Sequence, residues 1–334
     1  MESARVHALL QAAEAGDAAG VRALLTEEPA LVLAEGDHDK TALHVAAEKN
    51  HAEVADLLIA AGADLQALTS WGMTPLEWAA NMNSGAVADR LIAAGAEWTL
   101  WTASGLGRLD VVTSFCENPS PGRLDLLCVD PLEGRYTRTS RPEDAATVVS
   151  QAFQIACRNG HTAVAEYLSR RGADVDQRGF FDAPGLHWAA LNGHRETVAF
   201  LLDHGADITL RDGKFGSNPV GWALEGGHRD LAEYLMNRGA EINIWQAAKI
   251  GRRDKLRALL HADPMLLDAV HGWGAPLHEA AWFGQQATAE FLLARGADPQ
   301  RLSTDNLTPA MVADKRGHVA LAKLLREHEE KHRT

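Results

Sequence analysis

Ala-Pro-Gly-Leu-His-Trp-Ala-Ala-Leu-Asn-Gly-His, at residues 183–194, recurs in degenerate form along the whole chain of 334 residues. The glycine before the last histidine, or an asparagine in its place, falls at Gly16, Asn50, Asn83, Gly107, Gly160, Gly193, Gly227, Gly251, Gly284 and Gly317. Most of these positions lie 33 or 34 residues apart. A fixed period of this length is typical of a solenoid, in which each unit buries its apolar face against its neighbours.

The clearest unit, APLHEAAWFGQQATAEFLLARGAD at residues 275–298, shows what each position contributes. Proline suits a first helical turn because that turn needs no N–H donor, and glycine ends a helix in a left-handed turn. Paired alanines keep the first helix slim, and paired leucines form the apolar stripe of the second helix. The pattern therefore predicts a helix-turn-helix unit followed by a hairpin-like connection, which we call a finger.

This unit resembles the ankyrin repeat, whose pattern is Thr-Pro-Leu-His-x-Ala-Ala, then Gly-His, then Leu-Leu and Gly-Ala-Asp. The resemblance covers nearly all of residues 5–328 and implies an all-α ankyrin-repeat solenoid, with a single domain over residues 1–330. We expect repeats at approximately 5–35, 36–68, 69–99, 100–116, 145–177, 178–210, 211–242, 243–268, 271–301 and 302–328. Residues 117–143 are expected to form an inserted loop in a finger position.

Composition excludes several classes of partner. The net charge is −13 and no tract of Lys or Arg stands out, so we expect neither nucleic acid nor an anionic membrane as a ligand. No apolar run approaches the length of a membrane span, and the charged N-terminus does not resemble a signal peptide. The three cysteines lack a disulfide or zinc spacing, which fits a reducing cytoplasm.

The 15 histidines invite a metal hypothesis, but most of them follow the repeat. In ankyrin repeats, imidazoles at these positions make hydrogen bonds within and between units. We therefore expect a structural role for them, and we predict no metal and no cofactor. The histidines of the Thr-Pro-Leu-His position are His44, His187 and His278, and those after the turn are His51, His161, His194, His228 and His318.

Information about function is expected where the repeat is broken. Two steps, from Asn83 to Gly107 and from Gly227 to Gly251, span only 24 residues and lack about nine, the length of a finger. Trp101 and Trp245 fall on the usual histidine position in these fingerless units. The favoured interpretation is that each indole fills the space left by the missing finger.

A third irregular step, of 53 residues, carries the insert at 117–143, which is rich in Pro, Gly and Arg. Long loops in compact folds are usually functional or disordered. Two interpretations are open: a solvated loop, or a binding lid that grips an anion. The candidate residues in it are Arg135, Tyr136, Arg138 and Arg141.

Aromatic residues occupy positions that are normally polar and variable in the concave groove of ankyrin proteins, where partners usually bind. Exposed aromatic surface usually marks an interaction site, although packing among the fingers is the alternative. Trp78, Trp188 and Trp222, one residue after the histidine position, are instead expected in the core. The candidate groove residues are Trp71, Phe180, Phe181, Lys214, Phe215, Glu225, Lys249, His271, Trp273, Trp282 and Phe283.

The family resemblance implies a non-enzymatic protein–protein interaction module, acting as an adaptor, scaffold or inhibitor through the concave groove. The acidic balance suggests a partner with basic character. The alternative is a small-molecule binder, or an unusual enzyme, that holds a small aromatic or apolar ligand in a notch between Phe215 and Trp273, closed by the 117–143 loop. Glu225 with His271 or Lys249 is the best acid–base group for it, but no catalytic motif supports a reaction. A purely structural array is the third hypothesis.

Overall fold

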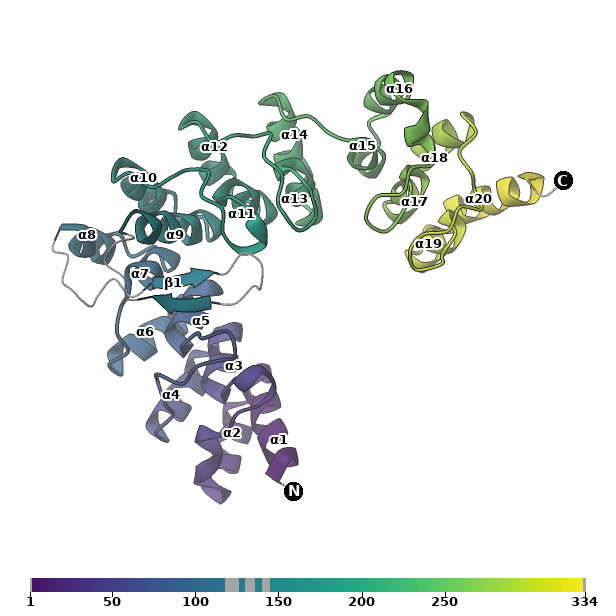
Figure 1. Ribbon diagram of the computed structural model, residues 1–334. Helices are drawn as coiled ribbons and strands as arrows, with labels where there is room; N and C mark the ends of the chain where they lie inside the picture. Colours follow the sequence, from purple (N-terminus) through teal and green to yellow (C-terminus); the bar gives the residue numbers. More distant parts are fainter. Residues whose placement is uncertain (1, 118–125, 130–135, 140–144, 333–334) are drawn as a thin grey trace. The chain divides into compact units, whose positions relative to one another are not determined.

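The computed structural model describes residues 2–117, 126–129, 136–139 and 145–332. Helices follow one another in pairs along the chain (Figure 1). Their bounds are α1 Glu2–Ala15, α2 Ala18–Glu27, α3 Ala42–Lys49, α4 Ala52–Ala60, α5 Pro75–Asn81, α6 Gly85–Ala93, α7 Leu100–Gly105, α8 Leu109–Glu117, α9 Ala145–Arg158, α10 Thr162–Arg170, α11 Gly185–Leu191, α12 Arg195–Asp203, α13 Pro219–Glu225, α14 Arg229–Asn237, α15 Ile244–Ile250, α16 Arg253–Ala262, α17 Pro276–Trp282, α18 Gln286–Leu293, α19 Pro309–Lys315 and α20 Val319–His332. Short 3₁₀ turns are η1 Pro29–Leu33, η2 Asp37–Asp39, η4 Phe180–Asp182 and η5 Pro264–Leu267.

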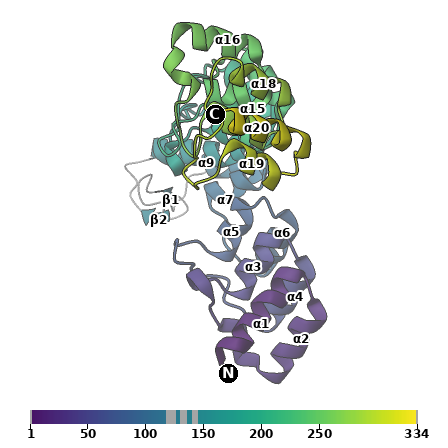
Figure 2. The ribbon, with the colours of Figure 1, turned by 90° about the vertical axis from the view of Figure 1, so that its right-hand side faces the viewer.

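The chain divides into two compact units, Met1–Trp222 and Ala223–Thr334. In the first unit, Figure 2 shows α1, α3, α5 and α7 in one row and α2, α4 and α6 in a second row, and contacts link successive helices within each row. Paired alanines such as Ala79 and Ala80 are fully buried in the first row, which allows the helices to stack closely. The predicted all-α ankyrin-repeat solenoid is confirmed, whereas the predicted repeat boundaries stay a prediction.

Local chemistry explains where the helices begin and end. At the start of α5, the Thr74 N–H donates to Glu77 at 2.7 Å and the Glu77 N–H donates back to the Thr74 hydroxyl at 3.3 Å, while Pro75 occupies the first helical position. The turn between paired helices needs a left-handed residue, which Gly193 supplies at φ 75° and Asn50 at φ 58°.

The repeat histidines connect one unit to the next. His44 Nε2 donates to the Met73 carbonyl at 3.0 Å, and the Thr41 N–H donates to His44 Nδ1 at 3.2 Å. Burial lowers the pKa of His44 to about 4, so its imidazole is neutral at pH 7. The predicted structural role is confirmed for the six histidines whose Nε2 bonds a neighbouring unit's backbone: His44, His51, His161, His187, His278 and His318.

The fingerless units correct one prediction. Thr102 and Gln246, not Trp101 and Trp245, occupy the third helical position that histidine usually holds, and each bonds the N–H of its N-cap residue. Counting back from the turn glycine gave the wrong residue because, in these units, the N-cap residue lies one position closer to the turn glycine than in the others. Trp101 is buried, and the Trp245 indole donates to the Ala269 carbonyl at 3.1 Å.

The insert lies between α8 and α9 in the sequence, yet the repeats on either side of it pack directly on each other. Helices α7 and α9 pack directly on each other, and the Asn159 side-chain amide donates to the Ala80 and Gly105 carbonyls, both at 2.7 Å. Within the predicted loop, β1 Leu126–Val129 and β2 Tyr136–Thr139 form an antiparallel pair (Figure 1). The described part of the insert is therefore a small hairpin within an otherwise helical chain.

Candidate functional site

Fingers join in three pairs, each through one backbone hydrogen bond. The Ser70 N–H donates to the His38 carbonyl at 2.9 Å, the Gly213 N–H to the Phe181 carbonyl at 3.1 Å, and the Thr304 N–H to the Trp273 carbonyl at 2.8 Å. We call these the first, second and third finger pairs. The predicted aromatic residues distribute over them, so each pair is a separate candidate site.

The first finger pair packs its aromatic ring onto its own repeat. Trp71 stacks on buried Trp78 with ring centroids 5.4 Å apart, and His38 lies 4.6 Å away on the neighbouring finger. The Lys40 ammonium lies 4.6 Å from the Trp78 ring and pairs with Glu48 at 2.6 Å. These contacts leave Trp71 half-buried, so much of its ring surface is covered by neighbouring residues.

The second finger pair holds the largest aromatic cluster. Phe180 and Phe181 lie 4.0 Å apart, each 6.1 Å from Trp188, and Trp188 meets Trp222 edge-on at 4.8 Å. Trp188 and Trp222 are buried, as predicted, and Phe181 contacts Phe215 edge-on at 5.6 Å. The cluster therefore runs from buried indoles on helices to phenyl rings on finger tips.

Its outer edge is exposed and positively charged. Phe215 is 53% exposed, and the Lys214 ammonium lies 4.0 Å from the Phe181 ring centre and 5.3 Å from that of Phe215. Ammonium groups are attracted to the negative face of an aromatic ring. Lys214, Phe181 and Phe215 together form what we call the phenyl clamp.

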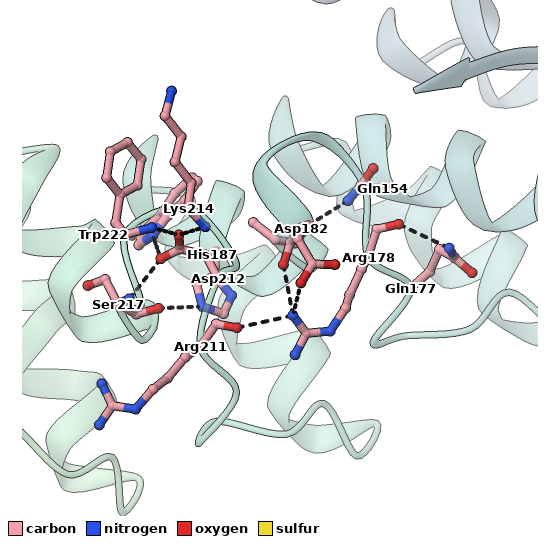
Figure 3. A network of polar contacts seen from close by, with 12 residues as sticks. Gln154, Gln177, Arg178, Asp182, His187, Arg211, Asp212, Lys214, Ser217 and Trp222 are labelled. Carbon is pink, nitrogen blue, oxygen red and sulfur yellow. Dashed lines mark hydrogen bonds and ion pairs between the residues drawn. The ribbon is translucent and has the colours of Figure 1, made fainter. Parts of the chain in front are cut away.

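Buried Asp212 shapes this finger tip (Figure 3). Its carboxylate accepts hydrogen bonds from the backbone N–H groups of Lys214, Phe215 and Ser217 and from the Trp222 indole at 3.0 Å. On the adjacent finger, the Arg178 guanidinium donates to the Asp182 carboxylate at 2.8 Å and to the Arg211 carbonyl at 3.1 Å. This network fixes the two tips that carry the phenyl clamp.

The third finger pair belongs to the second compact unit. Trp273 meets Trp282 edge-on at 5.2 Å, and the Arg316 guanidinium lies 4.5 Å from the Trp282 ring. The Lys249 ammonium lies 4.5 Å from the Phe283 ring. The predicted residues Trp273, Trp282, Phe283 and Lys249 therefore do come together, each half-buried.

A carboxylate lies beneath these rings. Glu279 accepts a hydrogen bond from the Trp273 indole at 2.9 Å, and burial raises the pKa of its carboxyl to about 7 although the Lys249 charge opposes the shift. The Lys249 side chain is only 13% exposed and pairs with Glu225 at 2.9 Å, whose side chain is 76% exposed. Glu279 is thus poised between its neutral and charged forms near neutral pH.

Of the two acid–base pairings predicted for Glu225, the one with Lys249 is formed. Glu225 meets Lys249 as an ion pair, whereas the His271 ring packs against Trp245 at 4.9 Å. Phe215 and Trp273, between which a notch was predicted, belong to different compact units, and the notch stays a prediction.

The structure describes only some of the candidate residues of the insert. Arg135 and Arg141 lie outside the described residues. Tyr136 and Arg138 lie on β2, opposite Val129 and Leu127 of β1. A role for these four residues stays a prediction.

Sequence reasoning missed the two carboxylates that organise the finger pairs, Asp212 and Glu279. Glu279 could have been noticed, because it is charged at a helix position that holds Val45, Trp78 and Trp188 in other repeats. Asp212 gave no such signal, since acidic residues are common in turns.

Two features bear on metals and membranes. Among the residues that the structure describes, no group of three or more His, Cys, Asp or Glu side chains is placed to hold a metal ion. No helix in the described ranges combines the length and apolar character needed to cross a bilayer.

Family models match the repeats of this chain. Models described as "Ankyrin repeats (3 copies)" match residues 9–102 and 153–246, and "Ankyrin repeat" matches residues 275–303. A stretch of 99 residues is 33% identical to NF-kappa-B inhibitor cactus of Drosophila yakuba, covering 29% of this chain and only 20% of that protein. The crystal structure of the human ASB11 ankyrin repeat domain aligns with 21% identity and a TM-score of 0.38, over 70% of this chain and 99% of that one. The chain belongs to the ankyrin repeat family, whose repeats indicate a protein-interaction module.

Proposed function

We propose that this protein is a non-enzymatic adaptor, scaffold or inhibitor that binds a protein partner on its finger tips, chiefly at the phenyl clamp. The observation that carries the proposal is the exposure of Phe215, 53%, beside a lysine on the same tip. Exposed aromatic surface that continues into a larger aromatic cluster is typical of an interaction site.

Backbone conformation supports the same assignment. Phe181 adopts φ 62° and ψ 20°, in the left-handed region where a side chain with a Cβ is disfavoured. In the third finger pair, Gly272 takes the left-handed φ of 63° without that cost. A bulky residue retained in such a conformation is typical of a functional site, because selection for stability alone would replace it.

The chemistry of the clamp defines the partner group that fits it. Phe181 and Phe215 offer apolar ring surface, and the exposed Lys214 offers a positive charge that no carboxylate neutralises among the described residues. An apolar partner side chain next to a carboxylate would satisfy both. At this tip the local charge thus favours an acidic partner group, opposite to the expectation from the net charge of −13.

Two further points support a binding role without catalysis. Of the two partners predicted for Glu225, Lys249 meets it as an ordinary ion pair at 2.9 Å, while His271 packs on Trp245. The matched relative from Drosophila yakuba is named an inhibitor of NF-kappa-B, which is a binding role.

Cys116 and Cys157 are free thiols, which supports placing the protein in a reducing cytoplasm.

The proposal is tested by quantitative affinity capture from the native cytoplasm with three forms of the protein: wild type, Phe215→Ala and Val319→Ala. Val319 is a matched control because it is an apolar residue, 74% exposed, at the start of α20, a helix that carries no finger residue. We expect Phe215→Ala to reduce recovery of a specific protein at least about tenfold, because a buried aromatic anchor contributes about 2 kcal/mol or more.

Val319→Ala should recover the same protein as wild type. Equal recovery by Phe215→Ala and wild type would show that the clamp is not the binding surface. Copurification of a small aromatic compound with no protein partner would instead favour the alternative of a small-molecule binder.

A further inference from the structure

A pocket of about 330 Å³ lies in the second compact unit, away from the residues of the third finger pair described above. It is formed by the end of α16, the turn η5 and the residue that follows α18 by two positions. The lining residues are Arg257, Leu260, His261, Pro264, Leu267 and Arg295.

Two arginines bring positive charge to this pocket, and His261 adds an imidazole that can make a hydrogen bond. Arg257 and His261 are four residues apart on α16 and so share a helix face. Arg257 and Arg295 are exposed, and neither makes an ion pair with a carboxylate among the described residues. Two unpaired guanidinium groups at one hollow of a chain with net charge −13 create a local positive potential that attracts an anionic ligand.

Arg295 is held in place without losing its donors. Its guanidinium carbon lies 3.5 Å from the centre of the Phe291 ring, and Nη1 donates to the Phe291 carbonyl at 3.4 Å. The remaining N–H groups are free to meet a ligand. Stacking on a ring reduces the rotamer freedom that binding would otherwise remove.

The floor and rim of the pocket are apolar. Leu260 is buried beneath it and Leu267 is half-buried, while Pro264 forms part of its edge. The next residue along η5, Met265, is 83% exposed. A ligand that combines an anion with an apolar group would therefore meet complementary surface on both parts.

The N-terminal repeat provides an internal comparison. Its α2–η1 segment, VRALLTEEPALV at residues 21–32, corresponds to LRALLHADPMLL at residues 256–267. Leu25 and Leu260 are equally exposed at 8%, and both segments turn at a proline, Pro29 or Pro264. The shared fold thus requires the leucine and the proline.

The basic groups are not shared. Thr26 stands where His261 is, and Ala61 and Leu57 stand where Arg295 and its supporting Phe291 are. Only Arg22 matches, at the position of Arg257. Because the same turn forms without them, His261, Arg295 and Phe291 are not needed to build it.

We propose that this pocket binds a phosphate monoester carried next to an apolar side chain on a protein partner. Two guanidinium groups with an imidazole match a dianion better than the single charge of a carboxylate, and the guanidinium fork matches phosphate oxygens. The apolar floor and Met265 receive the neighbouring side chain. This second binding site is independent of the phenyl clamp.

The test measures binding of three probes by isothermal titration calorimetry: the capped dipeptide phosphoserine–leucine, the same dipeptide without phosphate, and inorganic phosphate. We expect the phosphorylated dipeptide to bind most tightly of the three. Its affinity should fall as the salt concentration is raised, because the charges of Arg257 and Arg295 are exposed to solvent. Inorganic phosphate should bind about tenfold more weakly, since it lacks the apolar contact.

Arg257→Ala and Arg295→Ala should each weaken binding of the phosphorylated dipeptide about tenfold, because each removes charge-assisted hydrogen bonds. Arg22→Ala, the same change in the N-terminal copy, is the control and should leave binding unchanged. Arg295→Lys keeps the charge but loses the fork, and an intermediate affinity with an unchanged melting temperature separates recognition from helix stability.

Two results would overturn the proposal. One is equal binding of the phosphorylated and unphosphorylated dipeptides. The other is equal weakening by Arg22→Ala and Arg257→Ala. Tighter binding of inorganic phosphate than of the phosphorylated dipeptide would identify a small phosphate as the ligand and remove the protein partner from the proposal.

Discussion

The second and third finger pairs use the same indole–carboxylate contact with the two partners exchanged. In the second pair the carboxylate, Asp212, is on the finger and the indole, Trp222, is on the helix, 3.0 Å apart. In the third pair the indole, Trp273, is on the finger and the carboxylate, Glu279, is on the helix, 2.9 Å apart. Because of this exchange, the two carboxylates have different further hydrogen-bond donors around them.

The number of donors distinguishes the two carboxylates. Asp212 accepts three backbone N–H groups in addition to the indole, so its charge is satisfied where it is buried. Glu279 has the indole and, more distantly, the Lys249 charge, and its pKa is raised to about 7. Burial with many donors makes a structural anchor, whereas burial with few donors makes a group that titrates near neutral pH.

The largest expected effect comes from breaking the anchor. Asp212→Ala leaves three backbone N–H groups and one indole N–H without their acceptor in a partly buried turn. We expect a loss of about 4 kcal/mol in the free energy of unfolding of the second finger pair. Urea denaturation followed by tryptophan fluorescence measures it, and hydrogen exchange at residues 212–217 localises it.

Ser303→Ala is the matched control in the third finger pair. Ser303 is buried at the corresponding finger position, but its hydroxyl accepts only from the Asp305 and Leu307 N–H groups, at 3.3 and 3.2 Å. A loss of about 1 kcal/mol is expected. Similar losses for both variants would mean that the extra donors of Asp212 contribute nothing.

The second prediction concerns pH. The folded-state pKa of Glu279, about 7, lies above the ordinary value of 4.5, so folding favours its protonated form. The unfavourable contribution is absent below pH 4.5, grows as the pH rises towards 7, and is complete above 7. Glu279→Gln keeps an acceptor for the Trp273 indole and removes the charge, so it should stabilise the protein at pH 8 by about 2 kcal/mol and have little effect at pH 4.5.

Denaturation of both forms at several pH values between 4.5 and 8 gives the difference that isolates Glu279. Asp254→Asn serves as the control, because the hydrogen bond from Arg252 lowers the pKa of Asp254 to about 2, below the whole range, so its effect should not change between pH 4.5 and 8. A Glu279→Gln difference that stays constant with pH would contradict the assignment.

Sequence alone predicts the repeated frame well, because the spacing of proline, alanine and glycine acts within single helices and turns. The capping box of Thr74 and Glu77, for example, involves residues three positions apart. The spacing rule failed for Trp101 and Trp245, where the N-cap residue lies one position closer to the turn glycine.

The candidate sites depend on contacts that spacing does not encode. Phe215 and Trp222 are both aromatic residues of one repeat, yet one is exposed and the other buried. The burial that shifts the pKa of Glu279 comes from its surroundings in the fold, and the nearest opposing charge, Lys249, lies on a different helix. A site formed by side chains from different helices can be recognised only when the packing of those helices is known.

The smallest expected effect concerns the histidines of the same two finger pairs. In the third pair, the Ala275 N–H donates to His278 Nδ1 at 3.2 Å. In the second pair, Pro184 stands at that N-cap position and has no N–H, so buried His187 Nδ1 has no hydrogen-bond partner among the described residues. Burial also lowers the pKa of His187 to about 4, so this nitrogen is an unprotonated acceptor at neutral pH.

Pro184→Thr should supply the missing donor, as Thr41 does for His44, whose Nδ1 lies 3.2 Å from the Thr41 nitrogen and 2.9 Å from its hydroxyl. Proline at 184 has φ −66° and Thr41 has φ −83°, so the backbone need not move far. We expect a net gain of about 1 kcal/mol in the free energy of unfolding, after the loss of proline's restriction of the unfolded chain. Pro184→Ala restores the N–H without the hydroxyl and should give a smaller gain. Destabilisation by both variants would show that the unpaired nitrogen of His187 costs less than the rigidity of Pro184 contributes, and the two finger pairs would then differ here in chain entropy and not in hydrogen bonding.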